Sequence, residues 1–209
     1  MRFFFGLCCL VWTAAAWSAE APTLLVFGDS LSAGYGLRAE EAWPVLLQQK
    51  LGPQWHVVNA SVSGETTGGG LTRLPAALAA HHPRVVLIEL GANDGLRGLP
   101  IAEARANLAA MIEKAQASGA RPMLIAIRLP PNFGAAYTTK FAAMFDQLAE
   151  QYKLPKPPFL LDRMADKPDL FQPDQLHPIA QAEPMLLDNV MVALSPLLKT
   201  AQKTDKAGK

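Results

Sequence analysis

The sequence predicts an α/β protein of three layers, with a five-stranded parallel sheet between helices in a flavodoxin-like arrangement. Two observations support this fold class. Short apolar runs alternate with longer amphipathic segments along residues 20–198, which is typical of parallel strands joined by helical crossovers. The clearest runs also end at a glycine, as buried parallel strands often do. With no internal repeat and no linker, we expect a single domain over residues 20–198.

The expected elements follow in order along the chain. Residues 23–27, 55–59, 84–90, 123–127 and 159–161 are the five expected strands. Residues 43–51, 71–80, 100–119, 141–152 and 179–198 are the expected helices, each with apolar residues at helical spacing or a proline or glycine at an end. In such a sheet, ligands bind at the carboxyl ends of the strands.

Both ends of the chain lie outside this domain. Arg2 precedes an apolar run, and small residues follow it, which predicts a signal peptide over residues 1–19 cleaved between Ser18 and Ala21. The protein would then be periplasmic or secreted. Cys8 and Cys9 fall in that segment, so the mature protein would have no disulfide or cysteine ligand. Residues 199–209 are polar and lysine-rich, and we expect a flexible tail.

The charge balance excludes several classes of partner. Lys and Arg number 19 and Asp and Glu 18, a formal net charge of +1. No basic run suggests a nucleic-acid surface, and the N-terminal apolar run is shorter than the roughly 20 residues that span a bilayer. We therefore expect no nucleic-acid partner and no stable membrane anchor. We also expect a monomer, and no metal site.

A nucleophile, a base and an orienting carboxylate occur at opposite ends of the domain. Ser30 follows the first strand, where a hydroxyl on a strand-to-helix turn projects into the crevice. Asp174 and His177 share one turn before the last helix, so the carboxylate can orient the imidazole while the other ring nitrogen accepts a proton from a serine. Each cluster alone is equally typical of helix capping. Together they supply the three parts of nucleophilic catalysis.

Two further polar clusters follow the second and third strands. Gly64 can bring its N–H close to a substrate, and Asn93 can donate from its side-chain amide, as in an oxyanion hole. The alternatives are a turn with positive φ at Gly64 and an Asx-turn at Asn93.

These four clusters resemble, in order, the four blocks of the GDSL or SGNH hydrolase superfamily. The matching segments are Gly28-Asp29-Ser30-Leu31, Gly64, Gly91-Ala92-Asn93-Asp94 and Asp174-Gln175-Leu176-His177. The flanking sequence is most similar to the subfamily of bacterial periplasmic thioesterase/lysophospholipase/protease enzymes and arylesterases. The resemblance implies an SGNH hydrolase fold, Ser30 as nucleophile, His177 as base and Asp174 as orienter. It also implies an oxyanion hole formed by the Ser30 N–H, the Gly64 N–H and the Asn93 amide.

The sequence departs from that pattern in two places. Gln175 stands where relatives often carry glycine, which would alter the rim beside His177. Gly68, Gly69 and Gly70 follow the second block and would loosen its loop.

Apolar residues in the loops after the third and fourth strands predict an acyl-chain groove, although ordinary packing against the sheet would explain them equally well. The candidate walls are Leu96, Leu129, Pro130, Phe133 and Leu176. Asp29, Leu31, Asp94 and Arg97, which belong to the motif loops, are further candidates for substrate contact.

We therefore expect a serine esterase and thioesterase that needs no cofactor and acts on small acyl esters, aryl esters, acyl-CoA or lysophospholipids. Two alternatives remain at this stage. One is a carbohydrate O-deacetylase of the same superfamily. The other is a non-catalytic binding protein that retains the fold.

Overall fold

The computed structural model describes residues 20–207, so the predicted signal peptide lies outside the described residues. Its centre is a parallel sheet in the order β2-β1-β3-β4. The strands are β1 (Thr23–Gly28), β2 (His56–Asn59), β3 (Val85–Glu89) and β4 (Arg121–Leu124). Every residue of β3 is buried, which explains its continuous apolar run between two helical layers.

The predicted fifth strand is wrong: within the described residues the sheet has four strands. Phe159 makes only one isolated parallel bridge, to Ala126. The Ala126 N–H donates to Pro158 O at 2.8 Å and the Leu160 N–H donates to Ala126 O at 3.1 Å. Pro157 and Pro158 precede this segment, and because proline has no N–H to donate, a longer ladder cannot extend in that direction.

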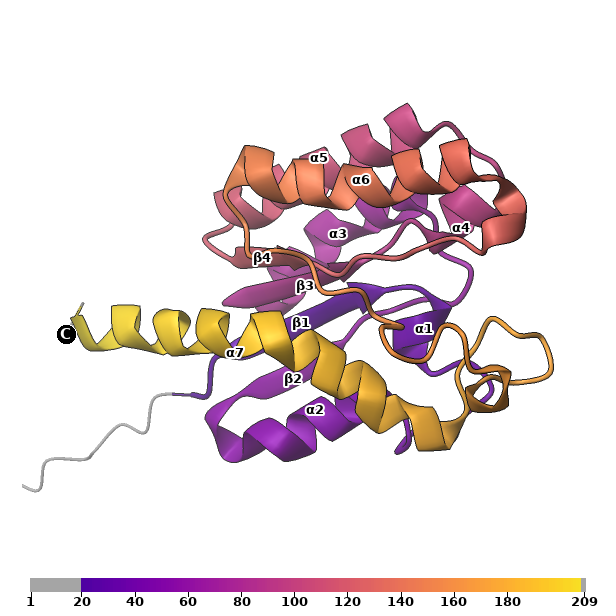
Figure 1. Ribbon diagram of the computed structural model, residues 1–209. Helices are drawn as coiled ribbons and strands as arrows, with labels where there is room; N and C mark the ends of the chain where they lie inside the picture. Colours follow the sequence, from indigo (N-terminus) through magenta and orange to yellow (C-terminus); the bar gives the residue numbers. More distant parts are fainter. Residues whose placement is uncertain (1–19, 208–209) are drawn as a thin grey trace, which may run out of the picture.

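Helices cover both faces of the sheet, which confirms the α/β class (Figure 1). On one face lie α3 (Thr67–His81), α5 (Ile101–Ala117) and α6 (Ala135–Tyr152), and on the other lie α2 (Trp43–Leu51) and α7 (Glu183–Ala207). The apolar sides of these helices meet the strands in one core, whose largest fully buried side chains include Trp43, Phe27, Phe141 and Phe145.

The last helix is longer than the sequence predicts. Helix α7 continues beyond Leu198 to Ala207, through most of the segment expected to be a flexible tail. Ala201 is fully buried, so at least the first residues of that segment pack against the domain.

Helix α3 begins four residues before the predicted start, at Thr67, and the three glycines form its first turn instead of loosening a loop. A Cβ on Gly70 would lie 2.5 Å from Leu90 Cδ1. The absence of a side chain there lets the helix approach the end of β3 closely.

Candidate active site

In the turn after β1, Asp29 caps the following helix and Ser30 belongs to the candidate site. Helix α1 (Ser30–Ala33) begins directly after β1, and Asp29 is its N-cap. The Asp29 carboxylate accepts the Leu31 N–H at 3.0 Å. Because Asp29 satisfies the helix end, the Ser30 hydroxyl is available for a partner elsewhere in the fold.

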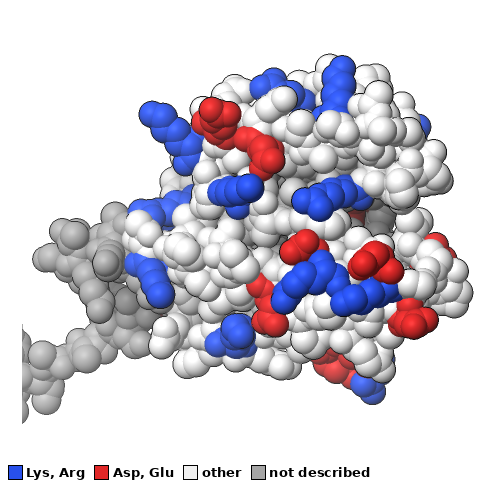
Figure 2. Space-filling model, in the orientation of Figure 1, with Lys and Arg blue, Asp and Glu red and all other residues white. Residues whose placement is uncertain are grey.

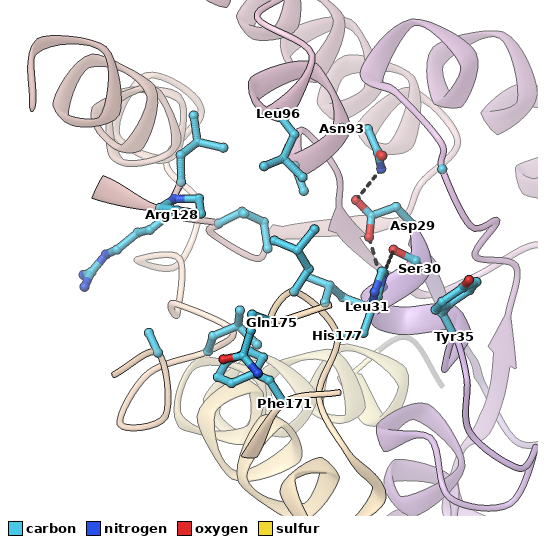
Figure 3. Close-up of a pocket in the computed structure, with 18 of the residues that line it drawn as sticks. Asp29, Ser30, Leu31, Tyr35, Asn93, Leu96, Arg128, Phe171, Gln175 and His177 are labelled. Atoms are coloured by element: carbon cyan, nitrogen blue, oxygen red, sulfur yellow. Dashed lines mark hydrogen bonds between the residues drawn. The ribbon is translucent and has the colours of Figure 1, made fainter. Parts of the chain in front are cut away.

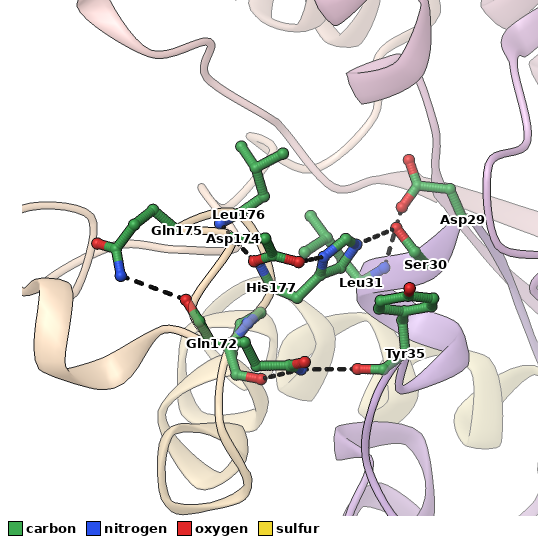
Figure 4. Close-up of polar contacts among 10 residues, drawn as sticks. Asp29, Ser30, Leu31, Tyr35, Gln172, Asp174, Gln175, Leu176 and His177 are labelled. Atoms are coloured by element: carbon green, nitrogen blue, oxygen red, sulfur yellow. Dashed lines mark hydrogen bonds and ion pairs between the residues drawn. The ribbon is translucent and has the colours of Figure 1, made fainter.

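That partner is His177, 147 positions along the chain. His177 Nε2 lies 2.8 Å from Ser30 Oγ, and His177 Nδ1 lies 2.7 Å from Asp174 Oδ2 (Figure 4). An ionised carboxylate can only accept, so Nδ1 carries the proton and Nε2 accepts from the serine hydroxyl. The three side chains therefore form one continuous hydrogen-bond chain.

Asp174 is held as an anion by its own turn. Its Oδ1 accepts the backbone N–H groups of Leu176 at 2.9 Å and His177 at 3.0 Å. Burial raises the pKa of Asp174, but the hydrogen bonds from the His177 ring and these two N–H groups outweigh it and lower the pKa to about 2. Asp174 is therefore ionised at every pH above about 3.

The loop that carries His177 is closed by its own hydrogen bonds and is joined to the segment that follows α1. No sequence motif indicates a role for Gln172. Its backbone N–H donates to His177 O at 2.7 Å. Its side-chain amide donates to Tyr35 O at 2.7 Å and Pro178 O at 2.9 Å. The Tyr35 ring lies against the imidazole with centroids 4.6 Å apart. These contacts fix the imidazole from two sides.

Gln175 has φ of 55°, in the left-handed region. A side chain at this position costs backbone strain that a glycine would avoid.

The predicted oxyanion donors also lie at this edge of the sheet. Gly64 has φ of 78° and lines the same cavity as Ser30. The Asn93 amide points toward Asp29 (Figure 3). It donates to Asp29 Oδ2 at 3.1 Å and to Glu65 O at 3.0 Å. Its donors are therefore oriented but already engaged, so an oxyanion would have to share or replace one of these acceptors.

Asp29 is fully buried between these groups. Burial raises its pKa to about 6, although the Leu31 N–H, His177 and the Asn93 amide oppose the increase. Its carboxylate thus lies close to the imidazole without belonging to the hydrogen-bond chain.

Comparison with known proteins identifies the family of the chain. The GDSL-like Lipase/Acylhydrolase family model matches residues 26–182. The chain belongs to this family. Esterase TesA from Pseudomonas aeruginosa is 46% identical over 193 residues, which cover 91% of this chain and 96% of that protein.

Two further relatives are similar over most of the domain. Thioesterase 1/protease 1/lysophospholipase L1 from Escherichia coli K12 is 44% identical over 181 residues, 87% of each protein. The crystal structure of psychrotrophic esterase EstA from Pseudoalteromonas sp., inhibited by monoethylphosphonate, has a TM-score of 0.79 at 43% identity. That match covers 85% of this chain and 98% of EstA.

An open cavity of about 500 Å³ extends from Ser30 and His177 in this GDSL family member (Figure 3). Six of the residues predicted to contact substrate line it: Asp29, Leu31, Leu96, Leu129, Pro130 and Leu176. Sequence reasoning missed much of the wall, including Tyr35, Ile127, Arg128, Phe159, Leu161 and Phe171. Ile127 and Phe159 read as strand residues in the sequence, and nothing local indicates that they face a cavity.

Three other predicted contact residues do not line the cavity. Asp94 is buried, and its carboxylate accepts the Thr67 N–H at 2.8 Å and the Thr67 hydroxyl at 2.6 Å. Arg97 donates to Gly64 O at 3.0 Å from the outside of the loop. Phe133 lies in a short 3₁₀ turn (Pro131–Phe133) outside the lining. Asp94 and Arg97 therefore hold the loop of Gly64 in place without facing the cavity.

Proposed function

We propose that this GDSL family enzyme hydrolyses acyl esters and thioesters with Ser30 as nucleophile, His177 as general base and Asp174 as orienting carboxylate. The observation that carries the proposal is the hydrogen-bond chain in which His177 Nε2 lies 2.8 Å from Ser30 Oγ and Nδ1 lies 2.7 Å from Asp174. This is the geometry that nucleophilic acyl transfer requires.

The reaction follows from these positions in two steps. His177 Nε2 removes the Ser30 proton as Oγ attacks the acyl carbonyl, and the imidazolium then donates that proton to the departing alcohol or thiol. Water takes the place of the leaving group, loses a proton to His177 and attacks the acyl-enzyme, which releases the acid and restores Ser30. Asp174 stabilises the imidazolium in both steps and keeps its own charge, because its pKa of about 2 lies far below neutrality.

The oxyanion would be held by the Ser30 N–H, the Gly64 N–H and the Asn93 amide. In this scheme the developing negative charge competes with Glu65 O for an Asn93 hydrogen bond. A preorganised donor of this kind is worth about 3–4 kcal/mol in the transition state.

The apolar walls of the cavity favour an acyl chain as the group bound beside Ser30. Leu96, Leu129 and Leu176 line the cavity that contains Ser30. The relatives are named esterase and thioesterase/lysophospholipase, and we infer the same range of medium and long acyl esters and thioesters here. On the face shown in Figure 2, acidic and basic side chains are interspersed, so apolar contact is expected to dominate recognition.

We also propose that the enzyme acts outside the cytoplasm as a monomer, after cleavage of residues 1–19. The arginine and apolar run of that segment support export. In the described part of the chain, no helix is both long and apolar enough to cross a membrane.

The test is hydrolysis of p-nitrophenyl esters from acetyl to palmitoyl by the mature protein and by Ser30→Ala, with a labelled fluorophosphonate as active-site probe. We expect hydrolysis with a maximum at medium or long chains, labelling of Ser30, and neither in Ser30→Ala. Normal activity in Ser30→Ala would refute the assigned nucleophile. A maximum at acetyl with a steep decline would instead favour the O-deacetylase alternative, and no labelling of the folded wild type would favour a binding protein.

A further inference from the structure

Glu89 lies directly beneath the turn that carries Ser30. It is the last residue of β3 and is fully buried. Its Oε2 accepts the Ser32 hydroxyl at 2.7 Å and the Asp29 N–H at 3.3 Å. These two donors lie on either side of the proposed nucleophile. Glu89 does not line the cavity, so it can influence the reaction only through the turn.

The end of β1 is shaped around this carboxyl group. A Cβ on Gly28 would lie 2.6 Å from Glu89 Oε2 and 2.9 Å from Ser32 Oγ. Glycine at this position therefore leaves the space in which the Glu89 carboxyl meets both donors, and the carboxyl and the turn form one packed unit.

Several features favour the neutral form of Glu89. Burial raises the pKa of Glu89 well above its usual range, the nearby Asp29 raises it further, and the hydrogen bonds from Ser32 and Asp29 oppose this only in part. Asp29 is the titratable group that faces Glu89, and it in turn faces His177 and Asp94. Glu89 Oε1 has no hydrogen-bond partner among the described residues, and a buried oxygen without donors is less costly on a neutral group than on a carboxylate.

The same turn also orients the proposed oxyanion donor. Asp29, whose N–H is bound by Glu89, accepts the Leu31 N–H through Oδ1 and the Asn93 amide through Oδ2. A displacement of Asp29 would thus reach both Ser30 and Asn93.

We propose that Glu89 is a positioning residue for ester hydrolysis, acting as a buried neutral hydrogen-bond acceptor that holds the nucleophile turn and, through Asp29, the Asn93 amide. The inference rests on the proposed roles of Ser30 and Asn93. Because a misplacement of about 1 Å can reduce turnover 100-fold, a residue that never contacts substrate can still control kcat.

The test compares Glu89→Gln, Glu89→Leu and the wild type on one p-nitrophenyl ester between pH 6 and 9. Glutamine presents the same carbonyl acceptor without a charge, so Glu89→Gln should keep kcat within about twofold over this range, as expected when both hydrogen bonds persist. Leucine leaves the Asp29 and Ser32 donors unpaired, so Glu89→Leu should lower kcat at least ~10-fold with KM nearly unchanged. The rate of Ser30 labelling by the fluorophosphonate should decrease in parallel.

The matched control is Glu183→Leu. Glu183 is likewise buried and accepts a backbone N–H, that of Trp43 at 2.6 Å, but Trp43 belongs to α2 and does not line the cavity. This variant should lose stability and keep kcat. If Glu89→Leu does not fold, Ser32→Ala removes one of the two hydrogen bonds and should lower kcat at constant KM.

Three results would overturn the inference: wild-type kcat in folded Glu89→Leu, wild-type kcat in Ser32→Ala, or equal losses in Glu89→Gln and Glu89→Leu. The last result would mean that a charge is required at this position. Failure of the proposed function would look different, because the wild type itself would then not be labelled at Ser30.

Discussion

Adjacent residues of one sequence motif have different roles in the site. Asp29 and Ser30 are neighbours and both suit a helix cap, yet Asp29 takes the cap and Ser30 Oγ lies 2.8 Å from His177 Nε2. Similarly, Asn93 and Asp94 are adjacent, but only Asn93 lines the cavity while Asp94 binds Thr67. In each pair the direction of the side chain, set by the turn, determines the role.

Asn93→Ala tests the proposed division at the residue scale. Loss of the amide should lower kcat by roughly 10²–10³, the effect of removing one oxyanion donor, and leave KM within a few-fold. Steady-state kinetics on one p-nitrophenyl ester measure both constants. Asn107→Ala is the matched control, because Asn107 donates to Thr67 at 3.1 Å and lies outside the cavity lining. A rise in KM alone for Asn93→Ala would contradict the role of this donor.

At the scale of elements, the close approach of α3 to the end of β3 explains a glycine-rich segment whose composition is typical of a loop. The first turn of α3 contains three glycines, of which Gly70 faces Leu90 and the Phe27 ring. At Gly68, by contrast, a Cβ would meet Asn107 Nδ2 at 3.7 Å, which is an ordinary van der Waals contact. The two positions therefore differ in what a methyl group would encounter.

Gly70→Ala and Gly68→Ala should change stability in opposite directions. A methyl at Gly70 would lie 2.5 Å from Leu90 Cδ1, so we expect overpacking to destabilise the protein by about 1–3 kcal/mol. A methyl at Gly68 fits, and we expect a gain of about 0.4–1 kcal/mol from reduced freedom of the unfolded chain. Urea unfolding of both variants measures the difference. Equal stabilities would show that α3 can move away from β3 at little cost.

At the scale of the whole molecule, helices far apart in sequence meet through buried polar groups. Glu183, in the first turn of α7, accepts the Trp43 N–H of α2 across 140 positions. Burial raises the pKa of Glu183 to about 7, and the Trp43 hydrogen bond offsets this only partly. The contact thus joins the helices of one layer and links their packing to pH.

The stability of the fold should therefore depend on pH through Glu183. Its folded-state pKa of about 7 exceeds the ordinary value of 4.5, so its contribution is complete below pH 4.5 and is lost as pH rises through 7. The loss amounts to up to about 3 kcal/mol, at 1.36 kcal/mol per pKa unit. Glu183→Gln removes this titration, so its free energy of unfolding should decline less than that of the wild type between pH 5 and pH 8. Urea unfolding at both pH values measures it, and parallel pH profiles of the two proteins would exclude Glu183 as the source.

Local sequence was sufficient to predict the four strands of the sheet, its five longest helices and the main polar groups of the site. Continuous apolar runs indicate β1 and β3, which are buried on both faces, and apolar residues at helical spacing indicate α5, which is buried on one face. Ser30 is recognisable because its motif lies at the carboxyl end of a strand, where parallel sheets bind ligands. Asp174 and His177 are recognisable from their spacing within one turn.

Tertiary structure alone decided what depends on packing between distant segments. The prediction of a fifth strand beside β4 is wrong. An apolar run such as residues 159–161 does not show whether the backbone around it can form a full set of strand hydrogen bonds. The cavity wall of Phe159, Phe171 and Tyr35 comes from three loops with no periodicity. Glu89 reads as one polar residue in an apolar strand, and its place beneath the nucleophile turn arises only from the pairing of Gly28 with Glu89 in adjacent strands. Sequence periodicity records which face of an element is buried, whereas the partner on that face is determined by how the elements pack.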